Sequence, residues 1–345
     1  IGPSVTITTP MAAPNDYYGP ARPLALLRGN SSDVPAGVDR VLVQIRNLDD
    51  GSFWHAGTSN WVVASSSFAV ANATAPWTFA GPAFINNKKY TVSVVGVDAA
   101  GNQTATPADR DFFYDANKPS STILSPNTAF QPRNVPAVIS GTALDVVNLP
   151  AQTTGYVQFV ELAIQETVSG NYWKGTVGLG GFSSGQTYRV TSSTPGGIPG
   201  AVVPWSYPAF GDTIPPWADG VNYTVKSRAV DRSQNVEPLE QSFAFTYDQT
   251  SPTTTVTSPA IGGSVPTVST VSGSFSEAFG LARVQVAVQR QDDKFWDGTG
   301  FNVSANPAPV PWFDAAIWAS TWSYHDPDFA AAFAIQPGIV QYVVW

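Results

Sequence analysis

The same short motifs occur three times along the 345 residues, and this repetition constrains the fold more than any other feature. Each copy opens with an alternating stretch that proline closes, at residues 3–10, 119–126 and 252–259. Each then places a glycine four residues before an acid, as Gly29/Asp33, Gly141/Asp145 and Gly273/Glu277. A chain with motifs repeated in this way is expected to fold as a series of similar units rather than around one large core.

The middle of each copy predicts a half-buried β-strand. Residues 41–46, 160–165 and 284–289 alternate apolar with polar or small side chains, which is the period-two pattern of such a strand. An aromatic–Trp pair follows, and its indole recurs as Trp54, Trp173 and Trp296. Recurrence at one position indicates packing rather than ligand binding. The stretch beyond it also carries tryptophans but varies in length, and it holds Trp77, then Trp205 and Trp217, then Trp312, Trp318 and Trp322.

Each complete copy closes with a strand and a tight turn. The sequence Tyr-x-Val leads to Asp-x-x-x-Asn at Tyr90 to Asn102 and again at Tyr223 to Asn235. A third such strand starts at Tyr342, and the sequence stops at Trp345. We therefore expect a third copy that is incomplete at its C-terminus, which would leave the apolar faces of Val284, Val286 and Val288 bare. We expect either that the protein continues beyond Trp345 or that a neighbouring chain supplies the missing strand by β-augmentation.

Short alternating strands separated by turn signals predict an all-β fold. We expect three tandem immunoglobulin-like antiparallel β-sandwiches at residues 1–117, 118–250 and 251–345, the third of them incomplete. Apart from a helical turn or two at 328–335, no helical periodicity occurs. The opening motif, the Gly-x-x-x-acid block and the Tyr-Thr-Val motif resemble those of bacterial immunoglobulin-like tandem repeats (Big or cadherin-like) in large secreted and cell-surface proteins. The resemblance implies a stalk, an adhesive array or a spacer.

Composition excludes several functions. The net charge is −8, and the 17 Lys and Arg residues are scattered, so neither nucleic acid nor an anionic membrane is expected as a partner. The chain has no Cys, which excludes disulfides and thiolate chemistry. No apolar run reaches the roughly 18 residues of a membrane span. The two histidines, His55 and His325, have no second histidine or cysteine near them in the sequence, and no catalytic motif is present, so we expect no enzyme.

The recurring acids have two readings. In a sandwich of this type, Asp115, Asp145 and Asp231 should gather at one pole of the second copy, Asp248 and Glu277 at the third, and Asp33 and Asp98 at the first. Carboxylates gathered in this way provide the oxygen ligands that Ca²⁺ takes, and the resemblance to cadherin-type junctions implies a calcium clamp. The other reading is local, because an Asp side chain also caps its own turn.

The sequence leaves two functions open. The first is a non-catalytic structural or adhesive array of a bacterial extracellular or cell-surface protein, with neighbouring copies or other surface proteins as partners, which could also assemble into a filament. The alternative is an accessory, glycan-contacting region of a secreted polysaccharide-active enzyme. Its candidate ligand platform is Trp312, Trp318 and Trp322, because tryptophans do not recur in that number in the other copies.

Overall fold

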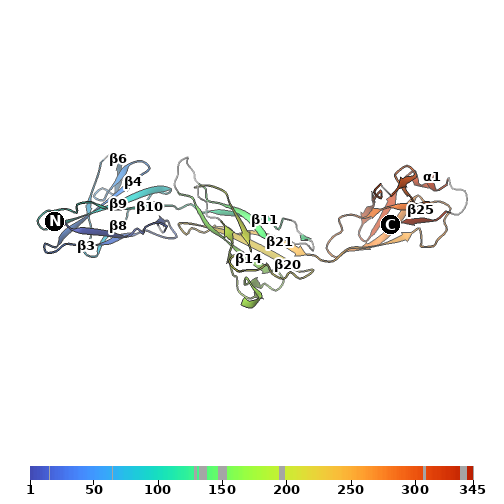
Figure 1. Cartoon of the computed structure of the whole chain (residues 1–345), viewed down its shortest axis with the longest axis horizontal. Coiled ribbons are helices and arrows are strands. Elements are labelled where there is room, and N and C mark those ends of the chain that lie inside the picture. The colour runs from blue at the N-terminus through green and yellow to red at the C-terminus, as the bar shows by residue number, and fades with distance from the viewer. Residues whose placement is uncertain are drawn as a thin grey trace. The chain divides into compact units, whose positions relative to one another are not determined.

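The computed structural model describes the chain except for residues 15, 64, 128–129, 132–137, 147–153, 194–198, 306–307, 335–339 and 345. The chain forms two compact units, Ile1–Tyr247 and Asp248–Trp345. The first unit holds two β-sandwiches, here called sandwich 1 (residues 1–114) and sandwich 2 (residues 120–247), and the second unit holds sandwich 3 (Figure 1). The division at Tyr247 lies close to the boundary expected near residue 250, whereas the boundary expected near residue 117 lies inside the first unit.

Sandwich 1 is built from two facing sheets, which are antiparallel except that β2 pairs β10 in parallel. The smaller sheet has the order β1-β3-β8, and in Figure 1 β3 and β8 lie in a different layer from β4, β9 and β10. Its strands are β1 (Ser4–Thr9), β3 (Leu26–Ser32) and β8 (Trp77–Ala80). The larger sheet has the order β2-β10-β9-β4-β5-β6, with β7 pairing β4. Its strands are β2 (Tyr17–Tyr18), β4 (Val38–Asn47), β5 (Ser52–His55), β6 (Asn60–Val63), β7 (Ala69–Val70), β9 (Lys88–Asp98) and β10 (Ala108–Tyr114).

Sandwich 2 repeats this plan. One sheet has the order β11-β13-β19-β18, with β11 (Ser120–Ser125), β13 (Ile139–Leu144), β18 (Ser192–Ser193) and β19 (Val203–Tyr207). The other has the order β12-β21-β20-β14-β15-β16, with β17 pairing β14. Its strands are β12 (Phe130–Gln131), β14 (Val157–Glu166), β15 (Tyr172–Trp173), β16 (Phe182–Ser183), β17 (Arg189–Val190), β20 (Asn222–Asp231) and β21 (Gln241–Tyr247). A 3₁₀ turn covers Val177–Leu179.

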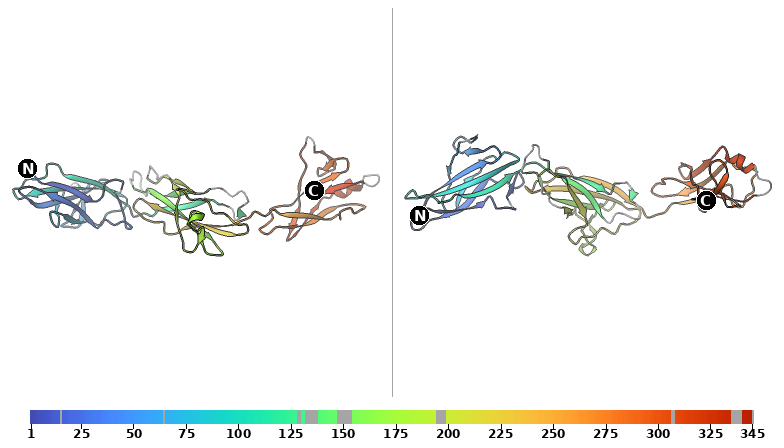
Figure 2. Two further views of the ribbon diagram at one scale, coloured as in Figure 1. Left: turned by 60° about the horizontal axis from the view of Figure 1, so that its bottom comes forward. Right: turned by 45° about the horizontal axis from the view of Figure 1, so that its top comes forward.

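Sandwich 3 forms its own compact body (Figure 2). One sheet has the order β22-β23-β30-β29, with β22 (Thr253–Ser258), β23 (Thr270–Ser276), β29 (Ala316–Trp318) and β30 (Thr321–His325). Opposite it lie the pair β24 (Gln285–Val286) and β28 (Phe313–Asp314), and a sheet in the order β27-β26-β25-β31. The strands of that sheet are β25 (Val288–Arg290), β26 (Lys294–Trp296), β27 (Phe301–Ser304) and β31 (Tyr342–Val344). A short helix, α1 (Phe329–Ala334), confirms the expected helical turns.

A glycine and a tryptophan face each other at the centre of every sandwich. The cross-strand partners are Gly29 and Trp77, Gly141 and Trp205, and Gly273 and Trp322. The three indoles are 0%, 2% and 3% exposed. A Cβ on Gly29 would lie 1.9 Å from the carbonyl oxygen of Thr6 and 2.5 Å from the Trp77 ring, and the other two glycines are equally crowded. The repeated glycine is therefore needed because an indole lies against the strand backbone, and one tryptophan of the stretch that seemed variable is fixed in each copy.

The recurring aromatic–Trp pair is also packed inward, as the sequence predicts. Trp173 and Trp296 are 1% and 0% exposed, and Trp54 is partly buried. The Trp173 indole N–H donates to the Tyr207 hydroxyl at 3.0 Å. In sandwich 3 the equivalent bond joins Trp296 to Tyr324 at 3.3 Å. These two buried indoles thus have a polar partner for their N–H groups.

The alignment of Tyr342 with Tyr90 and Tyr223 is confirmed by strand register. Tyr342 pairs with Arg290, as Tyr90 pairs with Asn47 and Tyr223 with Glu166. The strand β31 therefore occupies the place of β9 and β20, and it lies at the edge of its sheet among the described residues.

One expectation for sandwich 3 is wrong. Val284, Val286 and Val288 are 5%, 1% and 2% exposed rather than bare. They belong to the core cluster that also contains Val271, Trp296 and Trp322. Their side chains are covered by the opposite sheet, so their burial does not depend on a further strand at the edge of their own sheet.

The glycine–tryptophan contact gives a test of this fold. Gly29→Ala should destabilise the first unit by about 1–3 kcal/mol or more, because the added methyl group has no space between the Thr6 carbonyl and the Trp77 ring. Denaturant titration followed by tryptophan fluorescence measures the change. Gly57→Ala is the matched control, since a Cβ there meets nothing within 4 Å. Equal stability of the two variants would contradict the close packing.

Candidate metal centre at the joint between sandwich 1 and sandwich 2

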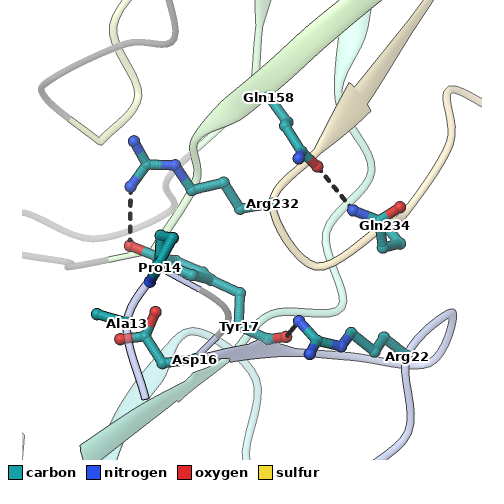
Figure 3. A pocket seen from close by; sticks show the side chains of 8 residues that line it. All are labelled: Ala13, Pro14, Asp16, Tyr17, Arg22, Gln158, Arg232 and Gln234. Carbon is teal, nitrogen blue, oxygen red and sulfur yellow. Dashed lines mark hydrogen bonds between the residues drawn. The ribbon is translucent and has the colours of Figure 1, made fainter. Parts of the chain in front are cut away.

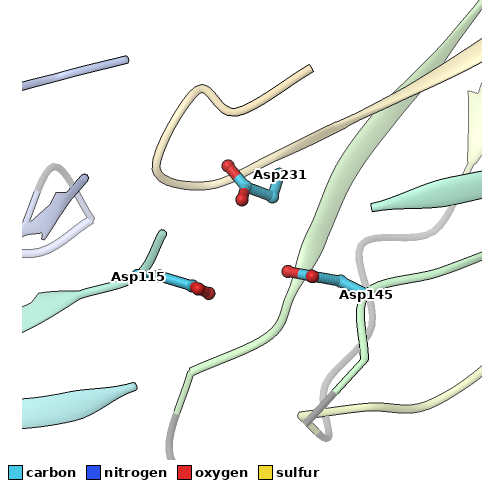
Figure 4. Close-up of side chains that lie close together, drawn as sticks. All are labelled: Asp115, Asp145 and Asp231. Carbon is cyan, nitrogen blue, oxygen red and sulfur yellow. The ribbon is translucent and has the colours of Figure 1, made fainter. Parts of the chain in front are cut away.

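Three carboxylates meet where sandwich 1 ends and sandwich 2 begins (Figure 4). Asp115 directly follows β10, Asp145 follows β13, and Asp231 ends β20. One carboxylate oxygen from each lies within 4.8 Å of the others. The three residues are 1%, 0% and 1% exposed. Within the described ranges, this is the one group of three or more His, Cys, Asp or Glu side chains close enough to share a metal ion.

Asp231 is positioned by its own turn. Its Oδ1 accepts from the Asn235 backbone N–H at 2.8 Å, and its Oδ2 accepts from the Asn235 side-chain amide at 2.8 Å. Asp98 makes the same two bonds to Asn102 in sandwich 1, at 2.8 and 2.7 Å. The turn-capping interpretation of this motif is therefore confirmed, and capping leaves further lone pairs on each carboxylate.

Asp115 is positioned by residues on both sides of the joint. Its backbone N–H donates to the carbonyl of Tyr18 in sandwich 1 at 2.8 Å. Its Oδ2 accepts from the backbone N–H of Gly155 in sandwich 2 at 3.0 Å, and its Oδ1 accepts from Asn117 at 3.0 Å. The Asn235 amide donates to its carbonyl oxygen at 2.9 Å. The carboxylate is thereby held against the pole of sandwich 2.

Asp145 is the unusual member of the group. Both of its side-chain oxygens are buried, and neither has a hydrogen-bond donor among the described residues. An ionised carboxylate in this position has lost its hydration and gained no partner, which is strongly unfavourable. Burial, followed by the charges of Asp115 and Asp231, raises the pKa of Asp145 to about 8.

The other two carboxylates respond to the same confinement. Burial raises the pKa of Asp231 to about 7, despite the lowering effect of its bonds to Asn235. Burial also raises the pKa of Asp115. In Asp98 the bonds to Asn102 prevail instead and lower the pKa. Asp98 and Asp231 cap the same turn and are 2% and 1% exposed, so the opposite pKa shifts come from the stronger desolvation of the Asp231 carboxylate and from the charge of Asp115 beside it.

The remaining acids named from the sequence do not form such a group in the described parts of the chain. Asp248 accepts from the Thr250 backbone N–H at 2.9 Å, and Glu277 accepts from Ala278 and Phe279 at 2.7 and 3.2 Å. Both cap their own turns. Asp33 has one buried oxygen without a described partner. Among the described residues, the predicted gathering of three acids is therefore found at the second copy alone.

A second set of contacts joins the two sandwiches, and Figure 3 shows two of the residues that make it, Tyr17 and Arg232. The Tyr17 ring stacks on Phe113 of its own sandwich at 4.7 Å and meets Tyr156 of sandwich 2 edge-on at 5.9 Å. The Arg232 guanidinium lies over both tyrosine rings, 5.4 Å from Tyr17 and 4.2 Å from Tyr156, and donates to the Tyr17 hydroxyl at 3.3 Å. A pocket of about 440 Å³ opens here, and Gln158 and Gln234 bond each other on its wall.

Sequence reasoning missed these joint residues. Tyr17, Tyr156 and Arg232 have no counterparts in the repeated motifs, and Arg232 stands where sandwich 1 has Ala99. Departures from a repeat are the available signal, because a residue that serves one joint has no reason to recur in every copy.

The tryptophans named as a ligand platform are divided by the structure. Trp312 and Trp318 are 49% and 57% exposed, whereas Trp322 is 3% exposed and packs against Gly273 in the core. Trp322 is therefore excluded from ligand stacking, because its ring faces are covered by protein.

Comparison with known proteins finds distant structural similarity only. No family model and no curated protein matches the chain. Among solved structures, the FN1–FN3 domains of chicken CNTN1 are 11% identical, with 99% of this chain and 91% of that chain covered and a TM-score of 0.31. A 1.5-MDa bacterial ice-binding adhesin is 14% identical, with coverage of 96% and 88% and a TM-score of 0.32. A Ca²⁺-stabilised adhesin of an Antarctic bacterium is 12% identical, with coverage of 96% and 67% and a TM-score of 0.27. TM-scores of this size do not bear on function.

The all-β fold class expected from the sequence is confirmed by the sheets themselves: the described strands form β-sandwiches whose pairs are almost all antiparallel. No helix among the described residues is long and apolar enough to cross a bilayer.

The raised pKa values predict how the metal-free protein responds to pH. Asp145 and Asp231 titrate near 8 and 7 in the folded state and near 4 when unfolded. The stability that their protonation supplies is complete below about pH 4 and is lost as pH rises through 7 to 8. Metal-free protein should therefore melt at a higher temperature at pH 5 than at pH 9, measured by scanning calorimetry.

The control for this dependence is Asp145→Asn, which has no charge at the most confined position. Its melting temperature should change less between pH 5 and pH 9. A metal-free wild type that is more stable at pH 9 than at pH 5 would show that the carboxylates are not confined together.

Proposed function

We propose that this chain is a non-catalytic spacer segment of a bacterial extracellular or cell-surface structural array, of the kind that the resemblance to bacterial immunoglobulin-like repeats implies. In this proposal Ca²⁺ binds Asp115, Asp145 and Asp231 and stiffens the joint between sandwich 1 and sandwich 2. One observation carries the proposal: the Asp145 carboxylate is fully buried, has no described donor, and faces two further buried carboxylates.

A divalent cation answers the electrostatic problem of this site. Three ionised carboxylates within 4.8 Å of one another repel strongly where water is excluded. Protonation relieves the repulsion, but it leaves the buried Asp145 carboxyl group without a described partner. A bound cation neutralises the charge and gives the Asp145 oxygens a ligand role. Structural burial of an unpartnered acid is otherwise hard to account for.

The donor set favours calcium over other metals. All three side chains offer oxygen, which is the ligand type of Ca²⁺, and backbone carbonyls or water complete its six to eight positions. Zinc prefers nitrogen and sulfur ligands. The chain has no Cys, and its two histidines are bonded elsewhere, His55 to the Ser65 carbonyl and His325 to the Ser269 carbonyl. Magnesium demands a near-ideal octahedron and gives up its water reluctantly, so it fits a confined three-carboxylate centre less well.

The location of the site gives it a mechanical role. The carboxylates come from the end of sandwich 1 and from two loops at the pole of sandwich 2, so a shared ion would cross-link the joint. Together with the other contacts across the joint, such a cross-link resists bending, which is what a spacer in an extracellular array needs. Millimolar affinity would suffice in that setting, because extracellular calcium modules work at 10⁻⁴–10⁻³ M.

Thermal unfolding with calcium and with chelator tests the proposal. Calcium should raise the melting temperature of the wild-type first unit, by an amount that corresponds to about 2.7 kcal/mol at a hundredfold excess over Kd. Asp145→Asn should lose most of this rise, because a charged ligand is gone. The same variant should be more stable than wild type in chelator, since it no longer buries an unpartnered carboxylate.

Asp109→Asn is the matched control, because Asp109 is an exposed acid of β10 outside the centre, and this variant should behave as wild type. Identical melting curves of the wild type in calcium and in chelator would overturn the proposal.

A second function is supported by the two half-exposed indoles of sandwich 3, which suit stacking on sugar rings. If sandwich 3 contacts polysaccharide, glycan-array binding by the wild type should be lost in the double variant Trp312→Ala, Trp318→Ala. The double variant Val168→Ala, Leu239→Ala removes exposed apolar side chains of sandwich 2 and should bind as the wild type does. Absence of glycan binding by the wild type would reject this function.

A further inference from the structure

The carboxylate centre fixes one point of the joint, but it does not fix the orientation of sandwich 1 relative to sandwich 2. Sandwich 1 reaches the centre only through Asp115, which continues from β10. Asp145 and Asp231 both belong to sandwich 2. A body held at one point can still pivot about it, so a bound cation by itself would not align sandwich 1 with sandwich 2. Alignment needs a second attachment, away from Asp115, that responds to the same centre.

Three asparagine side chains provide such an attachment. Asn86 and Asn87 lie in the loop before β9 of sandwich 1, and Asn117 lies two residues after Asp115. The Asn86 amide donates to Asn117 Oδ1 at 2.9 Å, and Asn86 Oδ1 accepts from the Ala116 backbone N–H at 2.6 Å. The Asn117 amide donates to Asn87 Oδ1 at 3.1 Å. We call these three side chains the asparagine ladder.

The ladder continues into sandwich 2. The Asn117 amide also donates to the carbonyl of Val146, the residue after Asp145, at 3.0 Å. The Thr154 hydroxyl donates to Asn87 Oδ1 at 3.1 Å, and Thr154 is 0% exposed. Thr154 precedes Gly155, whose N–H binds the Asp115 carboxylate. The ladder therefore touches the chain immediately beside two of the three carboxylates.

Asn87 is a specific feature of this joint rather than of the repeat. It has a positive φ of 60° and is 4% exposed. The equivalent residue of sandwich 2, also three positions before the tyrosine of the repeated motif, is Gly220 with a φ of 74°. The turn needs a left-handed residue, and glycine adopts that conformation without strain. Sandwich 1 instead has an asparagine, whose side chain reaches across the joint.

From these contacts we propose that the asparagine ladder is the positioning device that converts cation occupancy at Asp115, Asp145 and Asp231 into a fixed orientation of sandwich 1 on sandwich 2. This inference rests on the proposed calcium centre. When the ion draws Asp145 and Asp115 together, Val146 and Asn117 move with them, and Asn86 and Asn87 transmit that position to sandwich 1. The asparagines do not supply the binding energy of the ion.

The contacts of Arg232 are the alternative to the asparagine ladder as the attachment that orients sandwich 1 on sandwich 2. Arg232 lies over Tyr17 and Tyr156, and it makes no hydrogen bond to a carboxylate of the centre among the described residues. It should hold the two sandwiches together to the same extent with and without calcium. The two routes therefore differ in whether their effect depends on the ion.

The experiment measures ion binding and orientation separately on the full chain. Because the chain has no Cys, spin labels can be placed on cysteines introduced at Val63 and Val168, which are 66% and 84% exposed. Calcium affinity is measured by isothermal titration calorimetry. The distribution of distances between the two spin labels is measured by pulsed electron paramagnetic resonance. The key variant is Asn87→Gly, which removes the ladder side chain and keeps a residue suited to the left-handed turn. Asn117→Ala interrupts the ladder independently, and Arg232→Ala tests the competing route.

Calcium should narrow the distance distribution of the wild type. In Asn87→Gly and Asn117→Ala the affinity should stay within about threefold, while the narrowing is lost. Arg232→Ala should broaden the distribution equally with and without calcium. Narrowing that persists in both asparagine variants would overturn the inference, as would a loss of affinity beyond tenfold, which would make the asparagines part of the ion site. If the wild type binds no calcium, the proposed calcium centre is wrong, and the role proposed for the asparagine ladder is overturned with it.

Discussion

The constraint on which the joint depends is the exclusion of water from three carboxylates. Asp115, Asp145 and Asp231 are each at most 1% exposed, yet one of them has no described hydrogen-bond donor. A protein interior tolerates such charge only when it is paired, protonated or bound to a cation. The contacts around the centre hold two of the carboxylates in place and leave the third without a donor. Backbone N–H groups orient Asp115, an asparagine side chain orients Asp231, and Asp145 is left to face both.

Sandwich 1 and sandwich 2 show how one motif acquires two roles. Asp98 and Asp231 cap the same five-residue turn with the same bonds, but the pKa of Asp98 is lowered and that of Asp231 is raised. The difference arises because the Asp231 carboxylate is more strongly desolvated and has the charge of Asp115, from the end of sandwich 1, beside it. A repeated turn that is only a cap in one copy is therefore part of a candidate ion site in the next, without a change in its key residues.

Much of the fold could be predicted because it depends on local patterns. Period-two alternation located the strands, and the spacing from tyrosine to aspartate aligned Tyr342 with Tyr90 and Tyr223, as the strand register confirms. The role of the repeated glycines could not be predicted in this way. Gly29 and Trp77 are far apart in the sequence, and only strand pairing brings the indole against the glycine. The same limit explains why Trp322 was grouped with Trp312 and Trp318, although it belongs to the core.

By itself, the sequence determined the all-β class, the repeated strands and the capped turns at Asp98 and Asp231, because each depends on residues close together in the chain. It also named the three acids that meet at the joint, since the order of strands in such a sandwich places them at one pole. Only the tertiary structure decided that these acids are buried and that Asp145 lacks a described partner. It also decided that Asn86, Asn87 and Arg232 cross the joint. These properties depend on how one sandwich packs against the next, and contacts of that kind leave no periodic signal in the sequence.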